Sequence, residues 1–244
     1  MPFAANIVEI FSSIQGEGKY VGCRQLFVRF AGCNASCKYC DTADSRKPAL
    51  VAKVEGHSDL RDFITVPNPI PAERLLEYII QLYNNKHHSI SLTGGEPLCH
   101  ADMLYWLLPR IKGVKYLETN GTLPKELARV LPYVDIISMD IKLPSVAGTN
   151  YWAEHRDFLR LASEREMFVK IVISGETTDC EFNTAIQLIA DVDRGTTVIL
   201  QPVTPINGCA SVAPARVLLL QNEALNLLND VRVIPQTHKY IGLL

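Results

Sequence analysis

Short apolar runs rich in β-branched residues alternate along this chain with longer stretches whose apolar positions recur at helical spacing. The runs predict strands at residues 8–14, 25–30, 89–93, 116–119, 136–140, 168–174, 197–202 and 231–235. Helices are predicted at residues 71–84, 101–111, 124–130, 180–191 and 213–229, the first with Leu75, Leu76, Ile79 and Ile80 on one face. This alternation is typical of an α/β fold in which helices cover the outer side of a parallel sheet.

The stretch between residues 42 and 68 lacks this alternation. It combines Pro48, Gly56 and Pro67 with scattered charges, and such residues favour turns and loops. We therefore expect an irregular insertion at about residues 43–68. No low-complexity linker divides the chain, so residues 1–244 are expected to form a single domain.

Charge and hydropathy narrow the class of function. The 244 residues include 24 Lys plus Arg against 26 Asp plus Glu, a formal net charge of −2. This balance argues against a broad, positively charged surface that binds nucleic acid or anionic lipid. No apolar stretch approaches the ~18 residues of a membrane span, and the amino end lacks a secretory leader pattern. We expect a cytoplasmic protein that acts on a small molecule, without nucleic acid or membrane partners.

Three of the seven cysteines, Cys33, Cys37 and Cys40, lie close together directly after a predicted strand. Ligands of parallel α/β sheets bind at the carboxyl ends of strands, and three thiolates in one loop favour an iron–sulfur cluster. Structural zinc and three incidental cysteines are the alternatives, although zinc would need a fourth protein ligand. Ordinary buried or reduced thiols are expected at Cys23, Cys99, Cys180 and Cys209.

The spacing of these cysteines, with Tyr39 just before Cys40, resembles the radical S-adenosylmethionine superfamily. Residues 94–97, Gly-Gly-Glu-Pro after another predicted strand, resemble a second motif of that superfamily. The resemblance implies a partial (β/α)6-type TIM-like barrel with about six parallel strands, open on one side. It also implies a 4Fe-4S cluster on the three cysteines. The fourth iron would bind S-adenosylmethionine (SAM) and deliver the electron that cleaves it to a 5′-deoxyadenosyl radical.

The same resemblance implies a cofactor-binding set. Gly95 is expected to let bare backbone approach the methionyl amino group, where a Cβ atom would obstruct it. Ser138, Asp140 and Lys142 alternate along one predicted strand and should point to one face, although this run differs from the Ser-Pro-Lys version of many relatives. The residues expected to bind SAM are Tyr39, Cys40, Asp41, Gly95, Glu96, Ser138, Asp140, Lys142 and Gln201.

Residues 11–18, 28–34, 40–42 and 236–239 resemble the 7-carboxy-7-deazaguanine synthase family within that superfamily. This resemblance implies ring contraction of 6-carboxy-5,6,7,8-tetrahydropterin to 7-carboxy-7-deazaguanine with loss of ammonia, in queuosine-type 7-deazapurine biosynthesis, and a role for Mg²⁺. The residues expected to contact the substrate are Ile14, Gln15, Gly16, Glu17, Arg29, Thr93, His238 and Leu244, the last through its terminal carboxylate.

The residue types fit that substrate. Glu17 can accept hydrogen bonds from the guanidine-like edge of a pterin, and Arg29 can hold a carboxylate bidentately. Because Arg29 lies in an apolar run, its partner should be a ligand carboxylate or a nearby acid. Thr42 matches the family's Mg²⁺ position, and a hydroxyl oxygen is a suitably hard ligand. By sequence alone, Thr42 could equally be a helix N-cap.

Two other classes remain as alternatives. A glycyl-radical-enzyme activase shares the cysteine spacing and the compact size, but it would need a protein partner and would lack the substrate-directed set of Gln15, Glu17, Arg29 and His238. A zinc-binding module without enzymatic activity is the alternative outside the enzymes. For the synthase we expect an electron donor such as flavodoxin. We also expect a homodimer, because a second copy often covers an open barrel edge.

Overall fold

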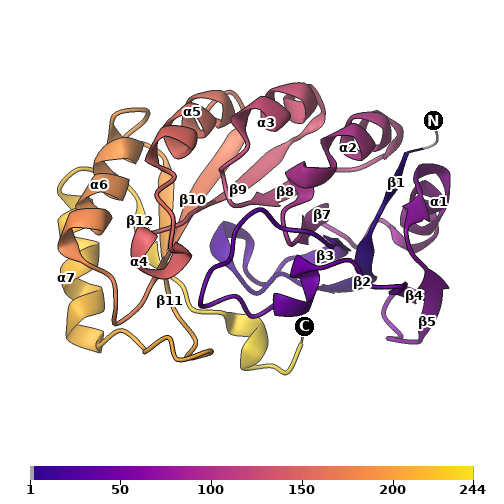
Figure 1. The fold of residues 1–244 in the computed structure, drawn as a ribbon, viewed down its shortest axis with the longest axis horizontal. Coiled ribbons are helices and arrows are strands. Elements are labelled where there is room, and N and C mark those ends of the chain that lie inside the picture. The colour runs from indigo at the N-terminus through magenta and orange to yellow at the C-terminus, as the bar shows by residue number, and fades with distance from the viewer. Residues whose placement is uncertain (1–2, 244) are drawn as a thin grey trace.

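The computed structural model describes residues 3–243, which form a curved sheet with helices along its outer side (Figure 1). The strands are β1 (Ala4–Ala5), β2 (Ile7–Ile14), β3 (Arg24–Phe30), β4 (Val51–Glu55), β5 (Phe63–Pro67), β6 (Ile70–Pro71), β7 (Ser89–Gly94), β8 (Lys115–Thr119), β9 (Ile136–Ile141), β10 (Glu166–Ile173), β11 (Thr197–Pro202) and β12 (Val231–Val233). The helices are α1 (Ala72–Leu82), α2 (Ala101–Leu107), α3 (Pro124–Val130), α4 (Pro144–Ala147), α5 (Trp152–Ala162), α6 (Asp179–Ala190) and α7 (Pro214–Leu225). None of the described helices has the length and apolar character needed to cross a lipid bilayer.

Within residues 3–243, ten strands form the main sheet in the order β12-β11-β10-β9-β8-β7-β3-β2-β4-β5. Neighbouring strands from β12 to β3 are all parallel, whereas β2 runs antiparallel to β3. No strand pairing joins β12 to β5 in this part of the chain, so the barrel is open. The expected partial barrel is therefore confirmed, with the short β12 added to its six principal parallel strands.

The segment predicted to be irregular contains a β-hairpin. Strands β4 and β5 pair antiparallel to each other, and β4 adds to the sheet beside β2. In β4 the buried Ala52 and Val54 alternate with the exposed Val51 and Lys53, which is the pattern of a half-buried strand. The prediction of an irregular insertion was wrong for these strands, because their short alternation is hidden between turn residues and charges.

Three helices differ from the expectation, among them the single-turn α4, which was not predicted. In α1, Ile80 is 65% exposed, and the buried stripe instead runs through Leu75, Tyr78, Ile79 and Leu82 at i, i+3, i+4 and i+7 spacing. Helix α5 was not predicted, because many of its residues are charged and its buried face includes a histidine. The other predicted helices are present, with ends shifted by a few residues.

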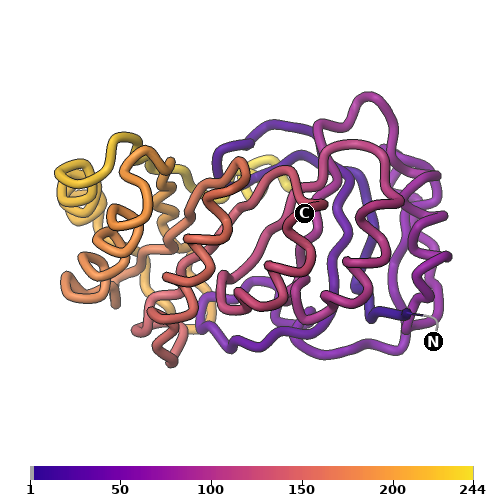
Figure 2. The backbone as a smooth tube through the Cα atoms, turned by 90° about the horizontal axis from the view of Figure 1, so that it is seen from above, coloured from indigo at the N-terminus to yellow at the C-terminus, as the bar shows by residue number. Residues whose placement is uncertain are grey.

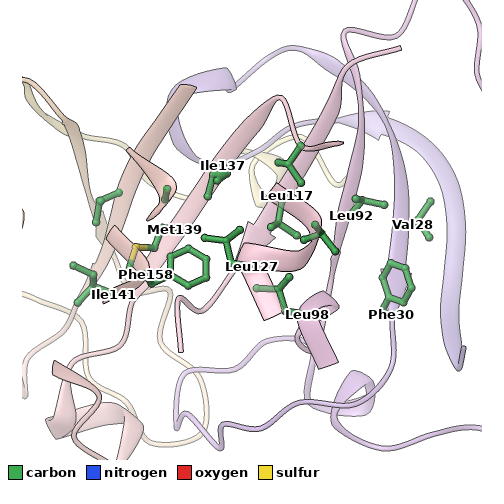
Figure 3. Close-up of a cluster of buried hydrophobic side chains, with 14 of the residues drawn as sticks. Val28, Phe30, Leu92, Leu98, Leu117, Leu127, Ile137, Met139, Ile141 and Phe158 are labelled. Atoms are coloured by element: carbon green, nitrogen blue, oxygen red, sulfur yellow. The ribbon is translucent and has the colours of Figure 1, made fainter. Parts of the chain in front are cut away.

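The core lies between the sheet and the helices, as the view in Figure 3 shows. Ile137, Met139 and Ile141 of β9 point into this layer and are fully buried there, near Leu127 of α3 and Phe158 of α5. Side chains alternate across a strand, so the intervening residues of β9 point to the concave side. A small apolar cluster closes part of that concave side, consisting of Tyr116, Ile136, Phe168 and Ile199.

Candidate active site

A cavity of about 440 Å³ opens at the carboxyl ends of the parallel strands, where this class of fold binds its ligands. It collects nearly all of the residues expected from the sequence. The predicted residues that line it are Ile14, Gln15, Gly16, Glu17, Arg29, Cys33, Cys37, Tyr39, Cys40, Asp41, Thr42, Thr93, Gly95, Ser138, Asp140, Lys142, Gln201 and His238. Glu96 is not part of its lining, and Leu244 lies outside the described residues.

The loop after β3 brings Cys33, Cys37 and Cys40 to one wall of this cavity. Arg46 donates a hydrogen bond to the Cys37 carbonyl, and the Cys40 amide donates to the same oxygen at 3.3 Å. All seven cysteines are free thiols, and Cys99 and Cys180 are exposed rather than buried. Burial raises the pKa of Cys33. Three unpaired thiols converging from one fixed loop fit a cluster that takes three protein ligands.

Glu96 links the turn after β7, in which it lies, to the carboxyl end of β8 and the loop that follows it. Its buried carboxylate accepts hydrogen bonds from the Thr119 hydroxyl at 2.9 Å and from the Asn120 amide at 2.7 Å. Burial raises the pKa of Glu96 to about 6, against the effect of these donors. Asn120 in turn donates to the Asn34 side chain at 2.9 Å. Glu96 therefore supports the cysteine loop through Asn120, and its own carboxylate does not face the cavity.

Gly95 is required by the packing of two loops. A Cβ atom on Gly95 would overlap the Gly32 carbonyl, which lies just before the cysteine loop, and would crowd the Ser45 carbonyl. The Glu96 amide donates to the same Gly32 oxygen at 2.8 Å. The expectation that Gly95 makes room only for a ligand was therefore incomplete, because its first role is to let the β7 turn touch the cysteine loop.

His155 of α5 fixes Asn120 from the helix layer. Its Nε2 lies 3.1 Å from the Asn120 carbonyl, and because a carbonyl can only accept, Nε2 carries the proton. His155 is fully buried, and its Nδ1 has no hydrogen-bond partner in the described part of the chain. Burial lowers the pKa of His155 to about 4 from 6.5, so the folded protein holds this imidazole neutral.

We expect this histidine to make the protein sensitive to mild acid. Between pH 6.5 and 4, His155 is protonated in the unfolded chain but stays neutral in the folded chain. The free energy of unfolding therefore falls as the pH drops through this range. The loss from pH 7 to pH 5 should be about 2 kcal/mol. Urea unfolding of wild type and His155→Gln at both pH values measures it. The variant should lose less stability on acidification, and an equal loss in both proteins would contradict this assignment.

Asp140 and Lys142 form an ion pair at the carboxyl end of β9. The Lys142 ammonium lies 2.7 Å from Asp140 Oδ2 and 5.2 Å from the centre of the Tyr39 ring. Burial opposes the charge on Lys142, but Asp140 outweighs it and holds the pKa of Lys142 well above its usual value. Asp140 Oδ1 and Gln201 Oε1 are buried acceptors without a hydrogen-bond partner among residues 3–243. Such unpaired acceptors fit a cofactor that brings its own hydroxyl and amino donors.

Glu17 is the centre of a second polar cluster. Lys170 of β10 forms an ion pair with Glu17 Oε2, and Gln236 donates to Oε1 at 2.6 Å. Burial alone would favour the neutral acid, but Lys170 and Gln236 lower the pKa of Glu17 to about 2. The Thr237 amide donates to the Gly16 carbonyl at 2.9 Å, and Figure 2 shows the yellow carboxyl-terminal segment passing close to an indigo segment of the chain. The carboxyl-terminal segment therefore forms part of the site.

Gln15 and Arg29 each have an acidic neighbour. Gln15 donates to Glu118 Oε1 at 2.7 Å, and Thr93 donates to the other oxygen of Glu118 at 2.7 Å. Arg29 donates through Nε to Glu9 at 2.8 Å. Of the two partners that the sequence left open for Arg29, the structure shows the nearby acid. The other guanidinium nitrogens make no hydrogen bond to the described residues and can reach a ligand.

Three important residues of the cavity were missed by the sequence-based site assignment, namely Glu118, Lys170 and Gln236. Lys170 had a usable signal, because a single lysine in the apolar run of β10 must find a counter-charge. Glu118 is the residue before the last of β8, the strand that pairs with β7. Gln236 lies in a run already noted for its resemblance, and only its contacts reveal its role.

Comparisons with known proteins agree with this geometry. Residues 27–189 match the model of the radical SAM superfamily. The 7-carboxy-7-deazaguanine synthase of Geobacter sulfurreducens is 44% identical over 246 residues, covering 98% of both chains. That of Archaeoglobus fulgidus is 36% identical and covers 98% of this chain and 99% of its own.

The crystal structure of QueE from Escherichia coli has the same fold. Its TM-score is 0.60 at 22% sequence identity, and the match covers 98% of this chain and 95% of the other. The radical SAM match implies the 4Fe-4S cluster and SAM as cofactors. From the family match and from identity along nearly its whole length, the chain belongs to the 7-carboxy-7-deazaguanine synthase family of the radical SAM superfamily.

Proposed function

We propose that this protein converts 6-carboxy-5,6,7,8-tetrahydropterin into 7-carboxy-7-deazaguanine and ammonia, for queuosine-type 7-deazapurine biosynthesis. The reaction removes ammonia without net oxidation, so SAM acts catalytically. The observation that carries the proposal is the meeting of three residue sets in one cavity. The cluster cysteines, the cofactor strand around Asp140, and the substrate set around Glu17 and Arg29 all line it.

We assign the cluster and SAM to neighbouring parts of one cavity. Cys33, Cys37 and Cys40 would hold the cluster, and Asp140 and Gln201 offer unpaired acceptors to SAM. When bound, the cluster and SAM supply a carbon radical that can remove a hydrogen atom from the substrate. The remaining SAM-directed residues, Tyr39, Asp41, Gly95, Ser138 and Lys142, share this wall of the cavity. Glu96 would act on the cofactor side only through the loops that it holds.

The protein's own residues position the substrate. Glu17 accepts hydrogen bonds from the aminopyrimidinone edge of the substrate. Its low pKa keeps the carboxylate charged at any physiological pH, so it can act only as an acceptor. Arg29 has guanidinium donors left for the substrate carboxylate beyond its bond to Glu9. Ile14, Gln15, Gly16, Thr93 and His238 complete the substrate side, and the terminal carboxylate of Leu244 is assigned to it as well. Fixing both ends of the ring system holds the reacting carbon still.

Mg²⁺ is assigned to Thr42. The Thr42 hydroxyl lines the cavity, lies 3.9 Å from Cys40 Sγ, and makes no capping bond to the following helical turn. The side chain therefore does not perform the N-cap role that the sequence left open. Apart from its contact with Cys40 Sγ, the Thr42 hydroxyl has no hydrogen-bond partner among the described residues. Such a hydroxyl fits a cation that prefers oxygen ligands and also takes substrate oxygens.

Replacing Thr42 by alanine should weaken the response to magnesium. We expect the Mg²⁺ concentration for half-maximal turnover to rise about tenfold, with less change in the turnover that remains without added metal. Titration of anaerobic turnover with Mg²⁺ measures this. Thr42→Ser should retain the response, and Ser36→Ala removes an exposed hydroxyl of the same loop as a control. An unchanged magnesium response in Thr42→Ala would remove Thr42 from the proposed site.

Two partners complete the proposal. An electron donor such as flavodoxin is needed, because cleavage of SAM consumes a reducing electron. A homodimer is also proposed. Strand β5 pairs only with β4 among the described residues and exposes Ile64, so this sheet edge offers an apolar position to a second copy.

Anaerobic incubation with reductant, SAM, Mg²⁺ and 6-carboxytetrahydropterin tests the function. The expected products are ammonia and the deazaguanine chromophore in equal amounts, with SAM largely conserved. Stoichiometric consumption of SAM without either product would overturn the proposal and favour an activase. A colourless, zinc-containing protein would overturn it in favour of the zinc module, because iron–sulfur clusters absorb near 400 nm.

A further inference from the structure

The donors beside Glu17 form an ordered row with its carboxylate. The Lys170 ammonium is bound to Oε2, and the Gln236 amide nitrogen lies 2.6 Å from Oε1. In order, the row consists of the Lys170 ammonium as a donor, Glu17 Oε2 and Oε1 as acceptors, and the Gln236 amide nitrogen as a donor. All three side chains line the cavity, although they come from the loop after β2, from β10 and from the carboxyl-terminal segment.

The orientation of the Gln236 amide is determined by its neighbours. Its nitrogen contacts Glu17 and also Asp41 Oδ2 at 2.8 Å, and both of these carboxylates can only accept. Its oxygen accepts from the Thr204 hydroxyl at 2.7 Å. A flipped amide would place an acceptor against two carboxylates, so the N–H donors must face Glu17.

Lys170 is equally well fixed. Its side chain is 12% exposed, and its ammonium also lies 3.5 Å from Asp140 Oδ2. Burial opposes its charge, but Glu17 and Asp140 outweigh it and keep the pKa of Lys170 above its usual value. Lys170 is therefore a permanent donor at one end of the row, and Asp140 prevents it from turning away from the cavity.

This row matches the edge of a 2-amino-4-oxo pteridine. That edge presents N1 as an acceptor, the 2-amino group and N3–H as donors, and O4 as an acceptor. Each carboxylate oxygen has two lone-pair sites, so Glu17 can keep its flanking donors while it accepts from the 2-amino group and N3–H. Lys170 is then placed beside O4 with one of its three N–H bonds left to donate, whereas both N–H bonds of Gln236 are taken by Glu17 and Asp41.

We propose that Lys170 determines specificity for the 4-oxo group of the 2-amino-4-oxo edge, with its ammonium donating to O4, while Gln236 holds the Glu17 carboxylate in place beside it. The ammonium is assigned to O4 because a carbonyl oxygen is the stronger acceptor for a full positive charge. This inference rests on the proposed function and deepens it. It assigns the choice between 4-oxo and 4-amino rings to a lysine outside the motifs of the sequence.

Two stable aromatic probes separate this role from a structural one. Calorimetric titration of the reconstituted enzyme with SAM would compare 6-carboxypterin with 2,4-diaminopteridine-6-carboxylate, near pH 8. The wild type should prefer the 4-oxo compound by about 100-fold, because a site built for one donor pattern rejects the reversed pattern strongly. In Lys170→Gln the preference should fall about tenfold, because an amide can donate to O4 or accept from a 4-amino group. The part that remains arises from N3, which in the diamino compound turns an acceptor toward Glu17.

Matched variants complete the test. Lys170→Arg keeps a charged donor and should retain most of the preference. Lys115→Gln removes another part-buried lysine ion pair, with Asp135, outside the cavity and should leave the preference unchanged. Equal weakening of both probes in Lys170→Gln, or a wild type without preference, would overturn the role of Lys170. If neither probe binds the wild type, the proposed reading of the 4-oxo edge by Lys170 is overturned, and turnover of 6-carboxytetrahydropterin tests the proposed function separately.

Discussion

The Cys37→Ala protein is expected to emerge nearly colourless from anaerobic reconstitution and to show no measurable turnover, a loss of at least about 10⁴-fold. Cys37 is the buried member of the three cysteines, and its carbonyl anchors the loop through Arg46 and the Cys40 amide. Removing its thiolate leaves two protein ligands for a cluster that needs three. Without the cluster the cavity has no source of the reducing electron. Iron content, absorbance near 400 nm and product formation measure the effect.

Cys99→Ala is the matched control for this experiment. Cys99 lies in the turn after β7, close to the cysteine loop, but it is exposed and does not line the cavity. The variant should keep about four irons per chain and near wild-type turnover. If Cys99→Ala lost its iron to the same extent, or if Cys37→Ala retained a full cluster, the three-cysteine ligand set would be wrong.

The fold could be predicted well from the sequence because the buried strands carry strong local signals. Strand β11 was predicted with its observed bounds, 197–202, because a β-branched and apolar run is buried on both faces of a parallel sheet. Strands β4 and β5 were missed because they lie at the sheet edge, where one face is open and the pattern is weak. Helix α5 was missed because the buried stripe of a surface helix needs only a few apolar positions.

The candidate site could be predicted as a set of residues, but its pairings could not. The cysteines, Asp140 and Glu17 stand at strand ends or in loops with recognisable motifs. The partners of Glu17 are different, because Lys170 and Gln236 lie 153 and 219 positions away in the chain. Only the curvature of the sheet brings these segments together, so no local sequence pattern can indicate the contact. For the same reason, the contacts by which Gly95 and Glu96 join two loops could not be predicted, and these contacts stand beside their proposed place on the cofactor side.

Replacing Glu17 by glutamine should lower kcat/KM for 6-carboxytetrahydropterin by about 10³-fold. Two charge-assisted hydrogen bonds to the substrate are lost, and an amide cannot accept on both of its terminal atoms. Lys170 also loses its closest counter-charge and keeps only Asp140. Because the pKa of Glu17 is about 2, the wild type should show no acid limb from this group between pH 5 and 8. Steady-state turnover over that pH range measures both effects.

A second readout separates substrate recognition from damage to the cofactor side. Slow cleavage of SAM by the reduced enzyme without pterin should stay within about threefold of wild type in Glu17→Gln, because Glu17 contacts none of the cluster cysteines. Glu166→Gln is the matched control, since Glu166 also pairs with a lysine, Lys19, but at the start of β10 and outside the cavity. It should leave kcat/KM unchanged. A Glu17→Gln enzyme with nearly wild-type kcat/KM, or one whose pterin-free SAM cleavage falls as steeply as turnover, would show that Glu17 does not read the pterin edge.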